Sequence, residues 1–384
     1  MEYKLLGEIA TYVNGYAFKP EHWGDKGLPI IRIQNLTNPN GGLNYYDGLI
    51  DEKYIVNPGD VLIAWSASLG VFEWNREKAL LNQHIFKVVF DKIEVDKTYF
   101  KFMVSQALNF ATKYLHGSTM KHITKKYFDN IQIPFPSLTE QKYIGGILEK
   151  VLCLKNKRES QITALNELTQ SLFLEMFGDP AKNPRKYPLS KLKDICIKIT
   201  DGTHHSPPMV ERGIPYVSAK HLGKGYLDFY SNPTYISKEE HEKIYKRCDP
   251  INGDVLYIKD GATTGIAGIN YYDFEFSMLS SLALIRPDSD QLINYYLVHY
   301  LNNARIKENI ISNMSGGAIK RLTIKKITDL SIVVPPIKLQ REFAEKVKKI
   351  NQQKELLKSN LKKMHNLYGS LLQKAFKGEL FQEQ

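Results

Sequence analysis

The 384-residue sequence predicts an α+β protein: two globular domains with mixed, curved sheets, separated by two long antiparallel coiled-coil helices. Three observations lead to this prediction. The chain repeats itself, each copy ends in a long helical heptad pattern, and the residues between the helices form short strand patterns separated by turns. We expect the first globular domain at residues 1–137, the first spacer helix at 138–178, the second domain at 179–336 and the second spacer helix at 337–384.

The internal repeat is the observation on which the other predictions depend. Residues 117–177 align without a gap to residues 316–376, at a constant offset of 199 positions. Upstream, the Gly-Asp-Val-Leu sequence of residues 59–62 returns at residues 253–256. Chance similarity between two amphipathic helices does not extend through a glycine turn and a proline. We therefore infer an internal pseudo-two-fold repeat.

The globular part of each copy is rich in strand and turn patterns. Runs of β-branched and aliphatic residues bounded by Asn, Gly and Pro predict strands at residues 30–33, 60–64, 84–90, 131–133, 254–258 and 282–285. Residues 99–115 and 292–311 have helical patterns. Each domain is therefore expected to be α+β, and a mixed sheet is favoured over a doubly wound one.

Each copy closes with a long helix whose start is marked by prolines. In the second helix the apolar residues step alternately by four and three positions, which is the spacing of a coiled-coil seam. The predicted seam residues are Ile144, Leu148, Val151, Ile162, Leu165 and Leu172 in the first helix, and Phe343, Val347, Ile350, Leu357, Leu361, Met364 and Leu371 in the second. A helix of about 35–40 residues is roughly 55 Å long, too long for one compact core, so we expect the two helices to pack on each other as spacers.

Lys155 and Lys354 occupy equivalent positions in the two seams. A polar residue in a seam can fix the register of the helices at some cost in stability. Alternatively, a lysine can bury its aliphatic stem and extend its ammonium group into water. The sequence leaves both interpretations open.

Charge and cysteine content narrow the class of protein. The formal net charge of +11 favours a polyanionic partner such as nucleic acid. Residues 337–384 hold over half of this excess, with 11 Lys and Arg against 5 Asp and Glu, so the protein is not uniformly basic. The three cysteines are isolated from one another, which predicts neither a disulfide framework nor a metal site. No apolar run reaches the length of a membrane span and the first residues lack a signal-peptide core, so we expect a cytoplasmic protein.

Several short motifs recur in the same order in both copies. They are the Gly-Asp-Val-Leu strand, a Gly-Ser or Gly-Gly turn at residues 117–118 and 316–317, a proline-led helix start at Pro136–Lys142 and Pro336–Arg341, and a closing Leu-x-x-Ser-Leu. In this order they resemble the specificity (S) subunit family of Type I restriction-modification systems, over essentially the whole chain. One departure is Leu339-Gln340, where the first copy has Glu140-Gln141.

The resemblance implies a non-catalytic subunit that gives a DNA methyltransferase and ATP-dependent restriction endonuclease complex its sequence specificity. Each globular domain would be a target-recognition domain that reads one half of a bipartite site in double-stranded DNA. The paired helices would set the spacing and dock two modification (methyltransferase) subunits, and restriction (helicase-nuclease) subunits would join the full complex. This chain would hold no cofactor, whereas its partners would use S-adenosylmethionine, and ATP with Mg. The competing hypothesis is a stand-alone DNA-binding regulatory or chromosome-organising protein.

Base recognition requires hydrogen-bonding side chains on loops, and polar residues that follow predicted strands are the candidates. In the first domain they are Arg32, Gln34, Asn35, Ser66, Ser68, Asn82, Gln83 and His84. In the second they are Thr203, His204, His205, Ser218, Lys220, His221, Lys259, Thr263 and Thr264. A basic cluster follows each glycine turn and predicts phosphate contacts by Lys121, Lys125, Lys126, Lys320, Arg321, Lys325 and Lys326. A solvated or turn-capping role is the alternative for each base-reading candidate, and a solvated helix start is the alternative for the basic clusters.

The sequence contains no convincing catalytic motif. Asn232-Pro233-Thr234-Tyr235 approaches the Asn-Pro-Pro-aromatic tetrapeptide of methyltransferases, but threonine replaces the second proline and no glycine-rich cofactor loop precedes it. The glycines of residues 261–268 fit neither a dinucleotide-binding nor a Walker pattern, which leaves a DNA-facing loop or a hairpin. The histidines of residues 204, 205, 221 and 241 lack acidic or cysteine companions at ligand spacing, so we predict no metal site.

Overall fold

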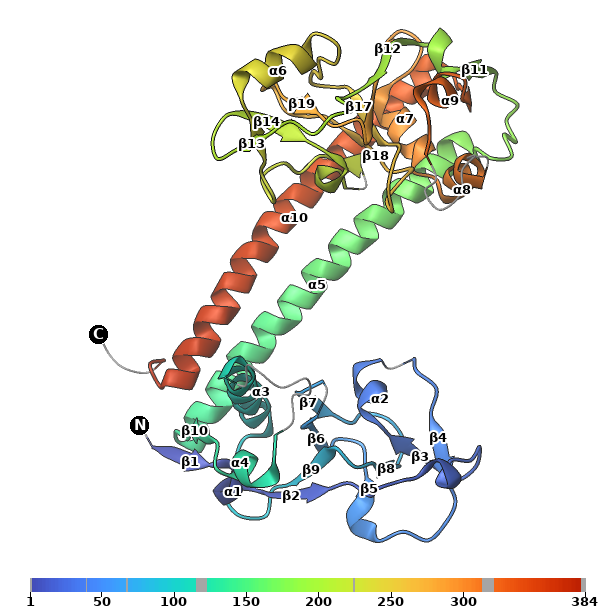
Figure 1. Cartoon of the computed structure of the whole chain (residues 1–384). Coiled ribbons are helices and arrows are strands. Elements are labelled where there is room, and N and C mark those ends of the chain that lie inside the picture. The colour runs from blue at the N-terminus through green and yellow to red at the C-terminus, as the bar shows by residue number, and fades with distance from the viewer. Residues whose placement is uncertain are drawn as a thin grey trace. The chain divides into compact units, whose positions relative to one another are not determined.

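The computed structural model describes residues 2–38, 40–66, 68–114, 123–223, 225–312 and 321–380 (Figure 1). The chain divides into two compact units. Unit 1 comprises Met1–Glu159 and Ser359–Gln384, and unit 2 comprises Ser160–Lys358. Each unit therefore combines one globular domain with the start of one long helix and the end of the other. The predicted α+β class with mixed sheets is confirmed.

Unit 1 is built on two small four-stranded sheets. The first is antiparallel, in the order β2 (Thr11–Asn14), β9 (Ile85–Val89), β6 (Val61–Ala64) and β7 (Gly70–Glu73). The second has the order β4 (Asn44–Tyr46), β3 (Leu28–Ile31), β8 (Ala79–Leu81) and β5 (Ile55–Val56), and it is mixed because β3 and β8 run parallel. The chain also forms a β1 (Tyr3–Leu5) pair with β10 (Gln132–Pro134) and helices α1 (Leu6–Ile9), α2 (Ile33–Thr37), α3 (Lys97–Tyr114) and α4 (Lys125–Asp129). Short 3-10 turns are η1 (Pro20–His22) and η2 (Glu52–Tyr54).

Unit 2 repeats this plan with additions. Its five-stranded sheet has the order β12 (Cys196–Asp201), β20 (Leu282–Pro287), β17 (Val255–Ile258), β18 (Ala267–Ile269) and β15 (Gly225–Tyr226). Its four-stranded sheet has the order β13 (Met209–Val210), β16 (Tyr235–Ile236), β14 (Ile214–Val217) and β19 (Ser277–Met278). The remaining elements are the β11 (Leu189–Lys191) and β21 (Ser331–Val333) pair, helices α6 (Lys238–Tyr245), α7 (Asn294–Leu301), α8 (Ala304–Ser312) and α9 (Ile324–Thr328), and turns η3 (Leu192–Asp194) and η4 (Ala219–His221).

The helix predicted at residues 292–311 is two helices, which corrects the prediction. In unit 1 the equivalent helix α3 is continuous, whereas α7 and α8 are separated at Asn302 and Asn303. The side-chain amide of Asn302 donates to the carbonyl oxygen of Ala267 at 2.8 Å and its oxygen accepts from the amide of Ala267 at 2.9 Å. This two-point contact with β18 holds the break in place.

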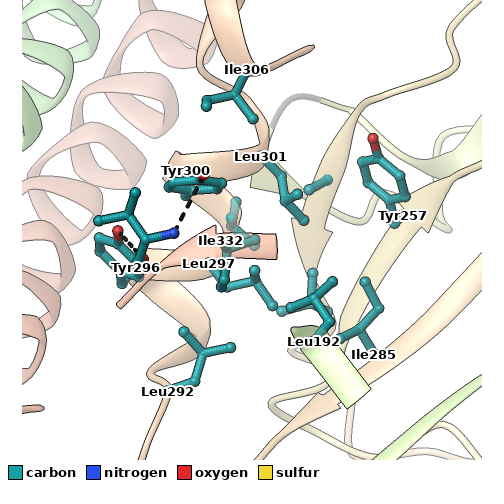
Figure 2. Close-up of a cluster of buried hydrophobic side chains, with 14 of the residues drawn as sticks. Leu192, Tyr257, Ile285, Leu292, Tyr296, Leu297, Tyr300, Leu301, Ile306 and Ile332 are labelled. Carbon is teal, nitrogen blue, oxygen red and sulfur yellow. Dashed lines mark hydrogen bonds between the residues drawn. The ribbon is translucent and has the colours of Figure 1, made fainter. Parts of the chain in front are cut away.

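A large core cluster of unit 2 lies where α7 packs against the sheet (Figure 2). Tyr296, Leu297 and Tyr300 are buried there. The Tyr296 hydroxyl donates to the carbonyl oxygen of Val333 at 2.7 Å, and the amide of Val333 donates to the Tyr300 hydroxyl at 3.4 Å. Burial raises the pKa of both hydroxyls, so they stay protonated. The tyrosines thus fix β21 to α7 while filling the core.

The two long helices are α5 (Leu138–Phe177) and α10 (Ile337–Lys377). In unit 1 the start of α5 and the end of α10 share one core, which includes Ile144, Leu148 and Ala375. Further along, Glu159 of α5 lies 3.6 Å from His365 of α10. The two segments therefore run antiparallel, as predicted. In unit 2 the roles are exchanged, because Phe343 and Val347 at the start of α10 share a core with the end of α5.

The predicted seam residues lie on the covered face of each helix. All of them are buried or half-buried, and so are Lys155 and Lys354. Burial lowers the pKa of Lys354, as expected for an ammonium group held partly away from water. Of the three cysteines, Cys248 is buried, Cys196 is half-buried and Cys153 is exposed on α5.

Candidate nucleic-acid interface

The candidate residues of the first domain gather where strands of its two sheets end. We call this region strand-end edge 1: Arg32–Asn35, Trp65–Ser66 and Asn82–His84. The amide of Asn82 donates to Ile31 at 3.3 Å, that of Gln83 to Tyr16 at 2.8 Å, and that of Trp65 to His84 at 3.2 Å. The amide of Ile123 then donates to the carbonyl oxygen of Trp65 at 3.2 Å, which brings the segment before α4 to the same edge.

The second domain has the same set of backbone hydrogen bonds. We call its equivalent region strand-end edge 2: Thr203–His205, Ser218–His221, Lys259–Asp260 and Ser280–Ser281. In each counterpart bond a backbone amide donates to a backbone carbonyl oxygen: Leu279 to Val217 at 2.9 Å, Ser280 to Thr203 at 2.8 Å, Lys259 to Ser281 at 3.0 Å and Leu322 to Lys259 at 3.0 Å. The repeat therefore extends from the helices into the two edges.

Glycine is required at the same crossing in both edges. A Cβ atom on Gly15 would lie 2.0 Å from the carbonyl oxygen of Asn82, and one on Gly202 would lie 1.8 Å from that of Met278. No side chain fits at such distances, so the close approach of the two chain segments depends on glycine. This shared requirement fixes the backbone while leaving the neighbouring side chains free to differ.

In edge 1 the candidates differ in how accessible they are. Gln34 is exposed, and so is Ser68, which lies in the turn before β7 rather than on the edge; Arg32, Ser66, Asn82, Gln83 and His84 are half-buried. The Arg32 guanidinium lies 5.2 Å from the centre of the Trp23 ring, a cation–π distance. Asn35 is buried, and its side chain accepts from the amide of Arg32 at 3.0 Å and donates to the carbonyl oxygen of Gly42 at 3.0 Å. Asn35 thus shapes the turn that presents its neighbours.

In edge 2, His221 takes the position of Asn35. It is buried, its Nδ1 accepts from the amide of Ser218 at 3.0 Å, and its Nε2 lies 2.8 Å from the carbonyl oxygen of Asn232. Burial lowers the pKa of His221, which keeps the ring neutral with a proton on Nε2. Both copies therefore cap this turn with a buried side chain, an asparagine in one and a histidine in the other.

The remaining candidates of edge 2 divide into exposed and paired groups. His204, His205 and Lys220 are exposed, and so is Thr263, which lies in the turn before β18 rather than on the edge; Ser218 is half-buried. Thr203 is buried and its hydroxyl lies 2.8 Å from Nδ1 of His205. Lys259 is buried between Asp201 at 3.4 Å and Asp260 at 3.1 Å, and the buried Thr264 donates to the carbonyl oxygen of Gly261 at 2.7 Å. The exposed group is the part of this edge that is available to a ligand.

The basic clusters lie on α4 and α9, beside the two edges. Lys125, Lys126, Lys325 and Lys326 occupy the first turns of these helices, and Arg321 precedes α9. Each helix starts with a threonine N-cap, whose hydroxyl accepts a backbone amide at 3.3 Å. Lys125 also pairs with Asp129 at 3.1 Å. Lys121 and Lys320, like the two glycine turns, lie outside the described residues.

Sequence patterns missed several residues that the structure brings to edge 2. Ser280 and Ser281 occupy the positions of Gln83 and His84, and aligning the repeat through the strands would have found them. Arg247 follows α6 and reaches Asp201 from outside the repeated elements, so no pattern in the sequence indicated it.

Metal sites and membrane spans are both absent from the described part of the chain. No group of three or more His, Cys, Asp and Glu residues there is arranged to hold a metal ion. No described helix has the length and apolar character needed to cross a membrane.

A family model for the Type I restriction modification DNA specificity domain matches residues 1–164 and 184–365. The chain is 23% identical to the Type I restriction enzyme EcoBI specificity subunit of Escherichia coli, covering 98% of this chain and 85% of that protein. It is 25% identical to the MjaIX specificity subunit of Methanocaldococcus jannaschii, covering 98% and 92%. Among solved structures, the S subunit from M. genitalium superposes with a TM-score of 0.62 at 16% identity, covering 98% of this chain and 96% of that one, which shows a shared fold.

Proposed function

The chain belongs to the Type I restriction-modification DNA specificity family, whose members are non-catalytic, and on this basis we propose that each of its globular domains reads one half of a bipartite DNA site. The observation that carries the proposal is the pair of strand-end edges. They share a backbone frame and differ in the side chains that face outward. Two readers with one frame and different side chains are what a site with two unlike halves requires.

We assign reading of the first half-site to the target-recognition domain of residues 1–137 and reading of the second to residues 179–336. In edge 1 the accessible donors and acceptors are those of Arg32, Gln34, Asn82, Gln83 and His84. In edge 2 they are those of His204, His205, Ser218 and Lys220. The lysines of α4 and α9 contact phosphates and so position each domain without selecting a sequence.

The helices of residues 138–178 and 337–384 hold the two readers at a fixed spacing and dock two modification subunits. Support comes from Leu168 on α5 and Leu367 on α10, which are equivalent in the repeat and are both 51% exposed. A single exposed leucine needs no explanation, but the same exposure at both equivalent positions fits a partner that binds once per copy. S-adenosylmethionine, and ATP with Mg, would be bound by the partner subunits rather than by this chain.

Co-purification tests this proposal. The chain is expressed in its native host with an affinity tag, and the recovered complex is weighed by native mass spectrometry. We expect one copy of the chain with two copies of a DNA methyltransferase, and restriction subunits in the larger assemblies. Leu168→Asp and Leu367→Asp should each reduce methyltransferase occupancy, while Gln170→Asp, which adds the same charge to another exposed position of α5, should not. Recovery of sequence-specific DNA binding without any methyltransferase would favour a stand-alone regulatory or chromosome-organising protein instead.

A further inference from the structure

A buried carboxylate organises the cationic side chains of strand-end edge 2. Asp201 stands at the end of β12, and its side chain is only 3% exposed. One of its oxygens, Oδ1, accepts from the guanidinium of Arg247. The other, Oδ2, lies 3.4 Å from the ammonium of Lys259 and 3.3 Å from Nε2 of His204. A buried carboxylate is expensive unless it is fully paired, so this arrangement ties the positions of three side chains to one fixed point.

The same network continues to the basic segment before α9. Lys259 also lies 3.1 Å from Asp260, and Asp260 lies 3.9 Å from the guanidinium of Arg321. Cationic and anionic groups therefore alternate in the order Arg247, Asp201, Lys259, Asp260 and Arg321. We call this network the charge ladder. Its centre is buried, whereas Arg247 is 57% exposed and Arg321 is 73% exposed.

The exposed end at Arg247 has the properties of a base-reading side chain. A guanidinium carries five donors in a planar fork, and only part of them is used by Asp201. Anchoring to a buried carboxylate removes much of the rotamer freedom that a free surface arginine would lose on binding. The commonest specific contact in the major groove is a bidentate one from arginine to O6 and N7 of guanine.

We propose that Arg247 is a specificity-determining residue that reads a guanine in the half-site of the second domain, and that Asp201 is the positioning residue that aims it. This inference rests on the proposed function, because it assumes that edge 2 faces DNA. Arg321, at the other end of the ladder, contacts a phosphate, so the ladder couples base reading to backbone positioning.

Among its described residues, the first domain has no equivalent of the ladder. Asn14 at the end of β2 takes the position of Asp201, and Trp65 takes that of Lys259. The Trp65 ring lies 5.0 Å from the His84 ring and 5.5 Å from the Phe86 ring, so an aromatic group occupies the space that charges fill in edge 2. The guanine contact is therefore assigned to the second half-site alone.

The test measures base discrimination by the complete complex with its methyltransferase subunits. DNA duplexes carrying every single-base change in both half-sites compete for wild-type, Arg247→Ala, Arg247→Lys and Asp201→Asn complexes at one salt concentration. We expect Arg247→Ala to lose about 5- to 150-fold discrimination at one G·C pair of the second half-site and none in the first. Arg247→Lys should not restore it, since an ammonium lacks the fork. Asp201→Asn should lose discrimination at the same base pair by a smaller factor.

Arg212→Ala, which removes another exposed arginine of the same domain, is the matched control and should keep the wild-type profile. Thermal melting checks that the variants are folded, and the exposed Arg247 variants decide the result even where Asp201→Asn does not fold. An unchanged profile for Arg247→Ala would overturn the inference, and so would a loss of affinity that is equal for all sequences, which is the behaviour of a phosphate contact. Failure of the proposed function itself is distinguishable, because the wild-type complex would then show no bipartite preference.

Discussion

In the first copy the Tyr99 hydroxyl donates to the carbonyl oxygen of Pro134 at 2.7 Å, and in the second copy Tyr296 donates to Val333 at the same distance. The hydrogen bonds at the starts of α5 and α10 agree as closely. Gln141 accepts from the amide of Asp96 at 2.9 Å, and Gln340 accepts from that of Ile293 at 2.8 Å. Side chains that hold the backbone frame have been kept in both copies.

The copies differ where side chains face the strand-end edges or the long helices. Trp65 in edge 1 is replaced by Lys259 and its ion pairs in edge 2. Phe102, which packs near Tyr368 of α10, is replaced by the half-buried His299 in unit 2. Backbone geometry has therefore been retained through the duplication, whereas the groups available for recognition have diverged.

Among these changes, removing an aromatic side chain from the core at the start of α10 should lower the stability of unit 2 most. Phe343 packs on Phe173 and Phe177 at ring distances of 5.6 and 5.3 Å, whereas its counterpart in unit 1 is Ile144. Phe343→Ala should cost about 3–5 kcal/mol of unfolding free energy in unit 2, because it leaves a cavity. Hydrogen exchange of unit 2 peptides measures the loss, and Leu356→Ala, at a site that is 63% exposed, is the control. An equal loss of protection throughout unit 1 would show that the units do not have separate cores.

His299→Phe gives unit 2 the side chain that unit 1 has at the equivalent position, Phe102. It should remove a pH dependence of the stability of unit 2. Burial, assisted by the charge of Lys354, lowers the pKa of His299 to about 4 from 6.5. The unfolded chain therefore binds more protons than the folded one between pH 6.5 and 4, so stability falls as the pH falls through this window. The stability lost across the whole window is about 3 kcal/mol, at 1.36 kcal/mol for each pKa unit.

Urea unfolding of unit 2 at pH 7 and at pH 4.5 measures this contribution. His299→Phe should flatten the difference, whereas His365→Phe, at an exposed position of α10, should leave it unchanged. If the difference in stability between pH 7 and pH 4.5 is as large in His299→Phe as in the wild type, the pH dependence comes from other groups.

The buried glutamines should have nearly equal effects in the two copies. Each accepts one backbone amide and donates to a proline carbonyl, Gln141 to Pro136 at 2.9 Å and Gln340 to Pro335 at 2.8 Å. Gln141→Leu and Gln340→Leu each leave a backbone amide and a proline carbonyl unpaired. Each substitution should lower the free energy of unfolding by about 1–3 kcal/mol. Denaturant unfolding compares the two variants. A near-zero cost for one of them would mean that water replaces its contacts in that copy.

Removing the lysines of α4 and α9 should have the mildest effect. If they contact phosphates, the double variants Lys125→Ala/Lys126→Ala and Lys325→Ala/Lys326→Ala should weaken DNA binding by the complex equally for all sequences. The slope of log affinity against log salt should fall by about 0.9 for each phosphate that is no longer neutralised. Titrations at several salt concentrations provide the measurement. A change in base preference would instead place these lysines at base edges.

The repeat and the heptads predicted the long helices and their covered faces, because these depend on residues close together in the sequence. Other features depend on contacts between distant residues, which leave no local pattern. Asn302 breaks a helix only because β18 lies beside it. Asn35 and His221 look like readers in the sequence, yet they are buried turn caps. Arg247 contacts edge 2 through Asp201, 46 positions away.

Whether the two copies are two independent readers can be decided by mapping the methylated positions in host DNA with long-read sequencing. We predict a motif of two short specified sequences separated by a fixed number of unspecified base pairs. We also predict that Arg32→Ala with Gln34→Ala alters only one of these sequences and that Arg247→Ala alters only the other. A single contiguous motif, or changes in both halves from either variant, would contradict the assignment of one reader to each copy.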